Sequence, residues 1–219
     1  MDEYIYRKAT LNDIPYLAEA VISAEKGISD KLSYATLFNI PETRVKELLI
    51  AMLEEEIDGC ELSLSSFLVA ECDGEIAGAL SAWIEGFDGS MPSQILKSNL
   101  ISYFFDKESI EFLKTKSHII KDILIERAPM TLQNEYLHIG EKYVGKGIDA
   151  ELVKKHEEIA LAKYPSLQKA QCQVFKSNIF AVKVSMKNGY KIVKSYKSSN
   201  DDILQFLPFN EKLLMEKSL

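Results

Sequence analysis

The chain alternates between two hydrophobic periods, and each period predicts one kind of element. Alternation at every second residue, or a short apolar run, predicts strands at residues 4–8, 67–72, 75–83, 135–139, 170–175, 190–196 and 212–217. Apolar residues three and four apart predict helices that begin near residues 14, 42, 95, 107, 150 and 179. A loop rich in Gly, Ser, Tyr and Phe is expected at residues 25–39, and a polar loop at residues 198–202. The pattern therefore predicts a chain in which strands and helices are mixed.

Local signals mark the ends of several of these elements. Asp73-Gly74 joins two apolar runs, and this dipeptide favours a hairpin because both turn positions need positive φ. Asp106 and Asn178 precede helical patterns as N-cap residues, and Gly189 follows one as a left-handed cap. These signals place a hairpin and three helix ends.

The later part of the chain predicts an insertion and then a crossover. Residues 87–130 predict a helical insertion between two strands of the sheet. A strand at residues 135–139, a helix from about Ala150 to Lys163 and a strand at residues 170–175 follow. A strand, helix and strand of these lengths predict a right-handed βαβ unit with two parallel strands.

Composition narrows the class of protein. The 219 residues are 47% hydrophobic and 27% charged, which is typical of a soluble globular protein, and we expect one domain over residues 1–219. The net charge is −7 without a basic block, which argues against a nucleic-acid partner. No apolar run approaches the ~20 residues of a membrane span. His156-Glu157-Glu158 lacks a second histidine at metal-binding spacing, so we expect a solvated helix face and no metal site.

The cysteines and the first residues bear on location. Cys60, Cys72 and Cys172 are widely spaced, as expected of reduced thiols. Met1 to Tyr4 carry acid and no apolar stretch, so we expect no signal peptide. Together these features predict a cytoplasmic protein.

A glycine-containing loop between the strand at residues 135–139 and the following helix is the strongest candidate for a binding site. Such a loop aims free backbone N–H groups and the positive end of a helix dipole at one point, which suits a phosphate. Residues 140–147 nearly match the nucleotide-binding pattern G-x-x-x-x-G-K-[ST]. The match fails at Gly147, where a hydroxyl would hold Mg²⁺, so a nucleotide triphosphatase is the weaker alternative.

A second motif downstream changes the interpretation of this loop. Residues 144–149 read VGKGID, beside the family pattern R-G-x-G-I-G, and residues 178–190 read NIFAVKVSMKNGY, beside N-x-x-A-x-x-L-Y-x-K-x-G-F. With two motifs in this order, the chain resembles the GNAT family of N-acetyltransferases over about residues 4–24, 67–85 and 133–217. The resemblance implies an α/β fold of the α+β kind: a mixed, mostly antiparallel central sheet with one splayed parallel strand pair, flanking helices and a helical insertion.

The resemblance also implies a cofactor and its contacts. Acetyl-CoA, as the acyl donor, would bind where the strand at residues 135–139 splays from the strand at residues 170–175. The residues implied at the cofactor are the backbone near Leu137, His138 and Ile139 for the pantetheine arm, the amides of Val144, Gly145, Lys146, Gly147, Ile148, Asp149 and Ala150 for the pyrophosphate, and Asn178 near the lower part of the arm.

Three residues depart from the family pattern. Val144 replaces an Arg or Gln, Asp149 replaces a Gly or Ala, and Ser185 replaces the Tyr that often returns a proton to the CoA thiolate. Serine is a far weaker acid than a phenol of pKa ≈ 10. Asp149 is a good helix-start residue, but its charge is unfavourable beside a pyrophosphate unless it points away.

Catalytic candidates follow from where they lie on the predicted strands. The resemblance implies that Glu135 is the base and that Ser185 lies at the position of the acid. His138 is an alternative base, although a histidine packed within a strand is the simpler interpretation. The resemblance implies that the strand ending at Trp83 and Glu85 faces the acceptor, where Trp83 would line a pocket and Glu85 would attract an amine. A structural ion pair is the alternative for Glu135, and core packing for Trp83.

The sequence thus predicts an N-acetyltransferase that moves an acetyl group from acetyl-CoA to an amine by direct transfer. The acceptor, a small molecule or a peptide, is left open. The alternative is a GNAT-fold protein that binds CoA without catalysis. Residues 25–66 and 87–130 are expected to carry specificity, and their apolar faces alternatively form a homodimer contact.

Overall fold

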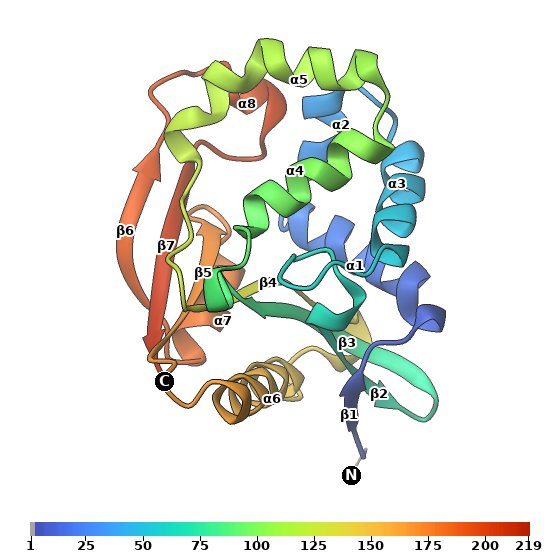
Figure 1. Cartoon of the computed structure of the whole chain (residues 1–219), viewed down its shortest axis with the longest axis vertical. Helices are drawn as coiled ribbons and strands as arrows, with labels where there is room; N and C mark the ends of the chain where they lie inside the picture. The colour runs from blue at the N-terminus through green and yellow to red at the C-terminus, as the bar shows by residue number, and fades with distance from the viewer. Residues whose placement is uncertain (1–2) are drawn as a thin grey trace.

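Seven strands form one sheet in the computed structural model, which describes residues 3–219 (Figure 1). The order across the sheet is β1-β2-β3-β4-β5-β7-β6. The strands are β1 (Ile5–Lys8), β2 (Phe67–Cys72), β3 (Glu75–Ile84), β4 (Leu132–Ile139), β5 (Lys169–Phe175), β6 (Lys191–Lys197) and β7 (Glu211–Ser218). All neighbours pair antiparallel except β4 and β5, which are parallel. The predicted fold class is confirmed.

Helices cover both faces of the sheet. They are α1 (Ile14–Lys26), α2 (Ser33–Phe38), α3 (Glu42–Glu54), α4 (Ser93–Phe104), α5 (Lys107–Ile120), α6 (Ile148–Lys163), α7 (Ile179–Lys187) and α8 (Ile203–Phe206). The predicted insertion contains α4 and α5, which lie between β3 and β4 in the chain. Helix α6 connects β4 to β5, so the predicted βαβ unit is present.

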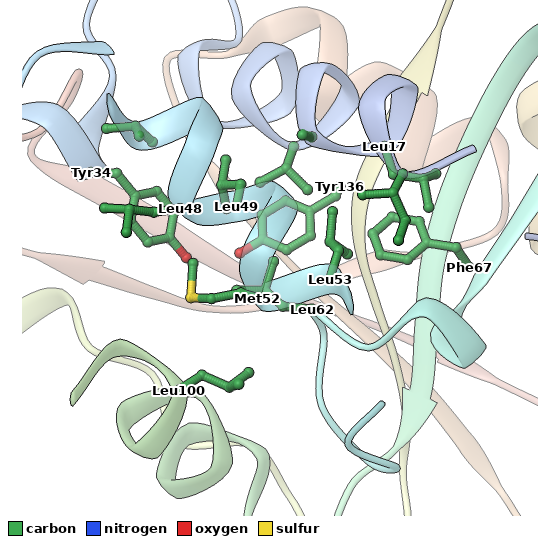
Figure 2. Close-up of a cluster of buried hydrophobic side chains, with 14 of the residues drawn as sticks. Leu17, Tyr34, Leu48, Leu49, Met52, Leu53, Leu62, Phe67, Leu100 and Tyr136 are labelled. Atoms are coloured by element: carbon green, nitrogen blue, oxygen red, sulfur yellow. The ribbon is translucent and has the colours of Figure 1, made fainter. Parts of the chain in front are cut away.

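The sheet separates two main clusters of buried hydrophobic side chains. On one face, α1, α3 and α4 pack over β2, β3 and β4, with Leu17, Leu49, Phe67 and Tyr136 among the buried side chains (Figure 2). On the opposite face, α6 contributes residues such as Leu152 to the second cluster. This two-sided burial explains why several strands are apolar runs rather than alternating ones.

The predicted turn and caps are present. Asp73 and Gly74 have φ of 52° and 78°, as the hairpin requires. The Ser109 N–H donates to Asp106 Oδ1 at 2.7 Å, and the Ala181 N–H donates to Asn178 Oδ1 at 3.1 Å. Gly189 has φ of 92° after α7.

Two short helices were not predicted. Helix α2 lies within the expected loop at residues 25–39, and α8 follows the loop at residues 198–202. Helices of six and four residues are too short for a hydrophobic period to show. Tertiary contacts hold α2 instead, since Tyr34 and Phe38 are buried in the core.

The sequence also led to expectations about the cysteines, membrane spans and the first residues. All three cysteines are buried, and none forms a disulfide within residues 3–219. Every helix in residues 3–219 is too short or too polar to cross a bilayer. Met1 and Asp2, which support the expectation about a signal peptide, lie outside the described residues. The single-domain assignment stays a prediction.

Candidate active site

The parallel strands β4 and β5 separate soon after they meet. They pair in register at only three positions, from Leu132 with Ala170 to Asn134 with Cys172. Beyond these pairs, β5 continues its pairing with β7 as far as Phe175, while β4 continues with β3 as far as Ile139. The edges of β4 and β5 that face each other therefore have backbone groups free of ladder pairing beyond Asn134 and Cys172, as the sequence resemblance implies.

A bulge in β4 sets the direction of its side chains. Tyr136 has φ of 57°, which is rare for a residue other than glycine, and the pairing with β3 shifts register between Ala79 and Ser81. As a result, Glu135 and Tyr136 both face the α1 side of the sheet, where Tyr136 joins the buried cluster and Glu135 reaches an arginine. A regular strand would send one of them to the opposite face.

The glycine loop leads directly into α6. Gly145 and Gly147 both have φ of 82°, and a Cβ added at either would meet no atom within 4 Å. The loop surface at these glycines is open. Because α6 begins at Ile148, the N–H groups of its first turn have no acceptors within the helix. This end of α6 can therefore bind an anion.

Two departures from the family pattern have different surroundings. Val144 is 51% exposed and contributes an apolar side chain at the loop surface. Asp149 Oδ2 accepts a hydrogen bond from Asn188 Nδ2 at 3.4 Å, so its carboxylate is directed toward the end of α7. This contact offsets part of the unfavourable charge expected beside a pyrophosphate.

Asn178 and Ser185, both tied to α7, are engaged within the protein. Asn178 caps α7, and its side-chain amide lies so close to Gly27 that a Cβ at Gly27 would be 2.5 Å from Nδ2. Cys172 Sγ contacts Ser185 Oγ at 3.7 Å. Burial raises the pKa of Cys172 to about 12, so this thiol stays protonated at neutral pH. Helix α7 is thus fixed to both α1 and β5.

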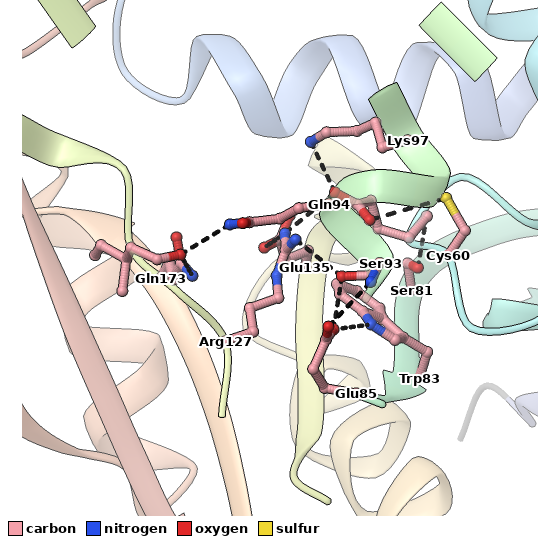
Figure 3. Close-up of polar contacts among 12 residues, drawn as sticks. Cys60, Ser81, Trp83, Glu85, Ser93, Gln94, Lys97, Arg127, Glu135 and Gln173 are labelled. Carbon is pink, nitrogen blue, oxygen red and sulfur yellow. Dashed lines mark hydrogen bonds and ion pairs between the residues drawn. The ribbon is translucent and has the colours of Figure 1, made fainter. Parts of the chain in front are cut away.

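Glu135 belongs to a buried network of charges centred on Arg127 (Figure 3). The guanidinium donates to Oε1 of Glu135, to Glu61 Oε1 at 3.1 Å and to Ser93 Oγ at 3.0 Å. Lys97 forms an ion pair with the same Glu61 oxygen at 2.7 Å. The side chains of Arg127 and Glu61 are 5% and 0% exposed, so these contacts replace almost all of their hydration.

The network is balanced in charge, with two acids and two bases. Burial opposes ionisation of Glu61, but Lys97 and Arg127 outweigh it and lower the pKa of the carboxyl. Burial likewise opposes the charge on Arg127, and Glu135 and Glu61 outweigh it and raise the pKa of the guanidinium. Glu61 and Arg127 therefore remain charged at neutral pH.

Glu85 and Trp83 are buried together beside this network. Glu85 is 3% exposed and accepts hydrogen bonds from Trp83 Nε1 at 2.9 Å, Ser93 N–H at 3.0 Å and Ser93 Oγ at 2.6 Å. Its carboxylate thus lies at the N-terminus of α4, where negative charge is favourable. These contacts occupy Glu85, so it is not available to attract an amine.

His138 on β4 and His156 on α6 have different surroundings. His138 is half-buried beside Tyr16, and burial lowers its pKa, so its imidazole is neutral near pH 7. His156 was expected on a solvated helix face, and this expectation was wrong. Its ring is 7% exposed, and its Nε2 lies 2.9 Å from the Leu80 carbonyl oxygen. Burial lowers the pKa of His156 to about 4.

Comparisons with known proteins agree with this geometry. No family profile matches the sequence, and no curated protein matches it. Solved structures do match over nearly the whole chain. An N-acetyltransferase from Staphylococcus aureus Mu50 is 14% identical, with a TM-score of 0.61 and coverage of 97% of this chain and 99% of the other.

Two further similar structures are those of a protein assigned to the GNAT family and of a protein with bound coenzyme A. A GNAT-family acetyltransferase from Streptococcus pneumoniae is 17% identical, with a TM-score of 0.50 and 99% coverage of both chains. The PaiA N-acetyltransferase from Thermoplasma acidophilum, solved in complex with coenzyme A, is 15% identical, with a TM-score of 0.52 and 99% coverage of both chains. With its splayed β4 and β5 and its glycine loop before α6, the chain has the GNAT acetyltransferase fold.

Proposed function

We propose that the protein is an N-acetyltransferase that transfers the acetyl group of acetyl-CoA directly to an amine. The observation that carries this proposal is the opening between β4 and β5, which leads to the glycine loop at the start of α6. Such an opening offers unpaired backbone groups along a strand and an anion site at its end. An elongated ligand with amide groups and a pyrophosphate matches both.

The cofactor contacts follow from this placement. The pyrophosphate would accept hydrogen bonds from amides between Val144 and Ala150, and the pantetheine arm would pair with the backbone from Leu137 to Ile139. Asn178, at the start of α7, would lie near the lower part of the arm. The side chain of Lys146, within the same loop, adds positive charge.

The chemistry requires one proton acceptor and little else. The amine nitrogen attacks the thioester carbon, the C–S bond breaks, and the CoA sulfur leaves as a thiolate. Arg127 engages Oε1 of Glu135, so Oε2 is the oxygen that we propose accepts the amine proton through a water molecule. Neutral His138 is the second candidate base. Ser185 would supply at most a weak hydrogen bond to the thiolate.

Cofactor binding tests the glycine loop. Replacing Gly147 by Ala should weaken CoA binding at least tenfold in isothermal titration, because the added methyl group would occupy the surface where the pyrophosphate approaches. Gly74→Ala is a matched control: Gly74 has a similar φ of 78° and equally open surroundings, but lies in the hairpin. Equal CoA affinities in the two variants would argue against this loop as the pyrophosphate site.

Turnover tests the reaction itself. Incubation with acetyl-CoA and a panel of amines should release CoA thiol in proportion to the amine, and release without an amine should be much slower. Thiol release that no amine increases, together with tight CoA binding, would favour the second candidate, a CoA-binding protein without catalysis. The ion pair of Glu135 with Arg127 is the observation that favours this alternative.

A further inference from the structure

A cavity of about 220 Å³ lies beside the ends of β5 and β7, under α2, α4 and α5. Phe175 and Lys212, which are partners in the β5–β7 register, form one wall. The strand β5 separates from β4 only three residues earlier, after Cys172, so the cavity adjoins the proposed acetyl-CoA site. Most of the remaining wall is apolar, formed by Leu37, Phe38, Ile101, Leu113, Ile120 and Leu207.

Two buried hydroxyl groups in this wall lack partners. Ser33 and Tyr34 are each 6% exposed, and neither hydroxyl oxygen has a partner within 3.5 Å in residues 3–219, although Glu25 lies near Ser33 and Tyr136 near Tyr34. A buried polar group without a partner destabilises the folded protein, because it has lost its hydrogen bonds to water. Polar atoms in this state beside a cavity indicate that a ligand completes their hydrogen bonds.

The cavity is also lined by one acid, Glu25, and one base, Lys212, that form no ion pair within residues 3–219. Lys97 lines it too, but Glu61 already neutralises that ammonium at 2.7 Å. Glu25 and Lys212 attract each other electrostatically, yet no ion pair within 4 Å joins either of them to any described residue. Burial raises the pKa of Glu25 and lowers the pKa of Lys212, so each charged form would be favoured by a ligand group of opposite charge.

These features specify the charges of a ligand that would fit the cavity. A dication would meet the Lys212 ammonium group, and a dianion would meet the Glu25 carboxylate. A molecule with one ammonium and one carboxylate would compensate both Glu25 and Lys212 and leave the cavity neutral. The apolar wall then requires an apolar body on that molecule.

We propose that the acceptor is a free α-amino acid with an apolar side chain. Glu25 and the Ser33 and Tyr34 hydroxyls bind its amino group, and Lys212 binds its carboxylate. Its side chain packs against the apolar wall formed by α2, α4 and α5. This inference rests on the proposed acetyl transfer, since the amino group bound at Glu25 is the one that would be acetylated.

Ligands that differ by one charged group test the inference on the unaltered protein. In isothermal titration with saturating CoA, L-leucine should bind at least tenfold more tightly than L-leucinamide, which lacks the carboxylate. The affinity for L-leucine should also exceed the affinity for 4-methylpentanoate, which lacks the amine, by a similar factor. Binding of leucinamide or spermidine equal to or tighter than that of leucine would overturn the assignment.

Two variants locate the site. Lys212→Gln should weaken leucine binding about tenfold, to the level of leucinamide, and Glu25→Gln should reduce it to the level of 4-methylpentanoate. Lys194→Gln, which removes an exposed lysine from the neighbouring strand β6, should leave leucine binding unchanged. Unchanged leucine affinity in Lys212→Gln protein that unfolds at the wild-type temperature would contradict the proposed role of Lys212.

The same titrations separate this inference from the proposed function. Titration of CoA alone reports on the cofactor site. CoA binding without preferential binding of leucine would overturn the acceptor assignment only. Leucine binding in protein that binds no CoA would support the cavity and overturn acetyl transfer.

Discussion

Replacing Arg127 by alanine is expected to lower the free energy of unfolding by about 3–5 kcal/mol, the usual cost of removing one partner from a buried ion pair. Arg127 is the shared partner of Glu61 and Glu135, and its side chain is 5% exposed. Its loss leaves Glu61 with Lys97 alone and leaves Glu135 without its ion pair. Urea unfolding followed by circular dichroism measures the change.

A surface ion pair provides the control for this experiment. Arg44 pairs with Glu47 on α3, and both side chains are more than half exposed. Arg44→Ala should change stability by less than about 0.5 kcal/mol, because exposed pairs of this kind contribute little. Similar losses in the two variants would show that the Arg127 network does not hold this part of the fold together.

Acidification is expected to destabilise the wild-type protein more than His156→Gln protein. The folded pKa of His156 is about 4, below the ordinary value of 6.5 in an unfolded chain. Between these values the unfolded state binds a proton that the folded state does not, so stability falls as pH decreases from 6.5 toward 4. At about 1.4 kcal/mol per pH unit, the loss is on the order of 3 kcal/mol.

The glutamine variant keeps the hydrogen-bonding role without the titration. His156 Nε2 faces the Leu80 carbonyl oxygen, which can only accept, and a glutamine amide can donate there as well. Acids whose protonation also changes stability as the pH falls are common to both proteins and cancel in the difference. His118→Gln, at an exposed position on α5, should follow the wild-type profile. Parallel profiles for wild type and His156→Gln would refute the assignment.

Much of the fold could be predicted because its signals are local. Asp73-Gly74 fixes a hairpin, and Asn178 and Gly189 mark the two ends of α7 through interactions within a few residues. Gly145 and Gly147 both have positive φ, and the glycines themselves indicate this backbone conformation in the sequence. Each of these features follows from short stretches of chain.

The charge network and the cavity could not be predicted in the same way. Glu61, Lys97 and Arg127 come from three separate segments, and none belongs to a recognisable motif. Glu25 lies near the end of α1, far in sequence from Lys212 on β7. Only tertiary folding brings such residues together. The prediction for His156 was wrong for a related reason. Glu157 and Glu158 beside it in the sequence indicated a solvated helix face, whereas the helix places the His156 ring in the interior.

The three residue pairs between β4 and β5 have a mechanical consequence. They act as the vertex of a wedge, so a small rotation of the β5–β7–β6 half relative to the β1–β4 half would displace atoms in proportion to their distance from Asn134 and Cys172. Positions near the vertex would scarcely move, whereas the rim would widen or narrow. Under the proposed function, reacting atoms near the vertex would keep their positions while contacts at the rim adapt to ligands of differing bulk.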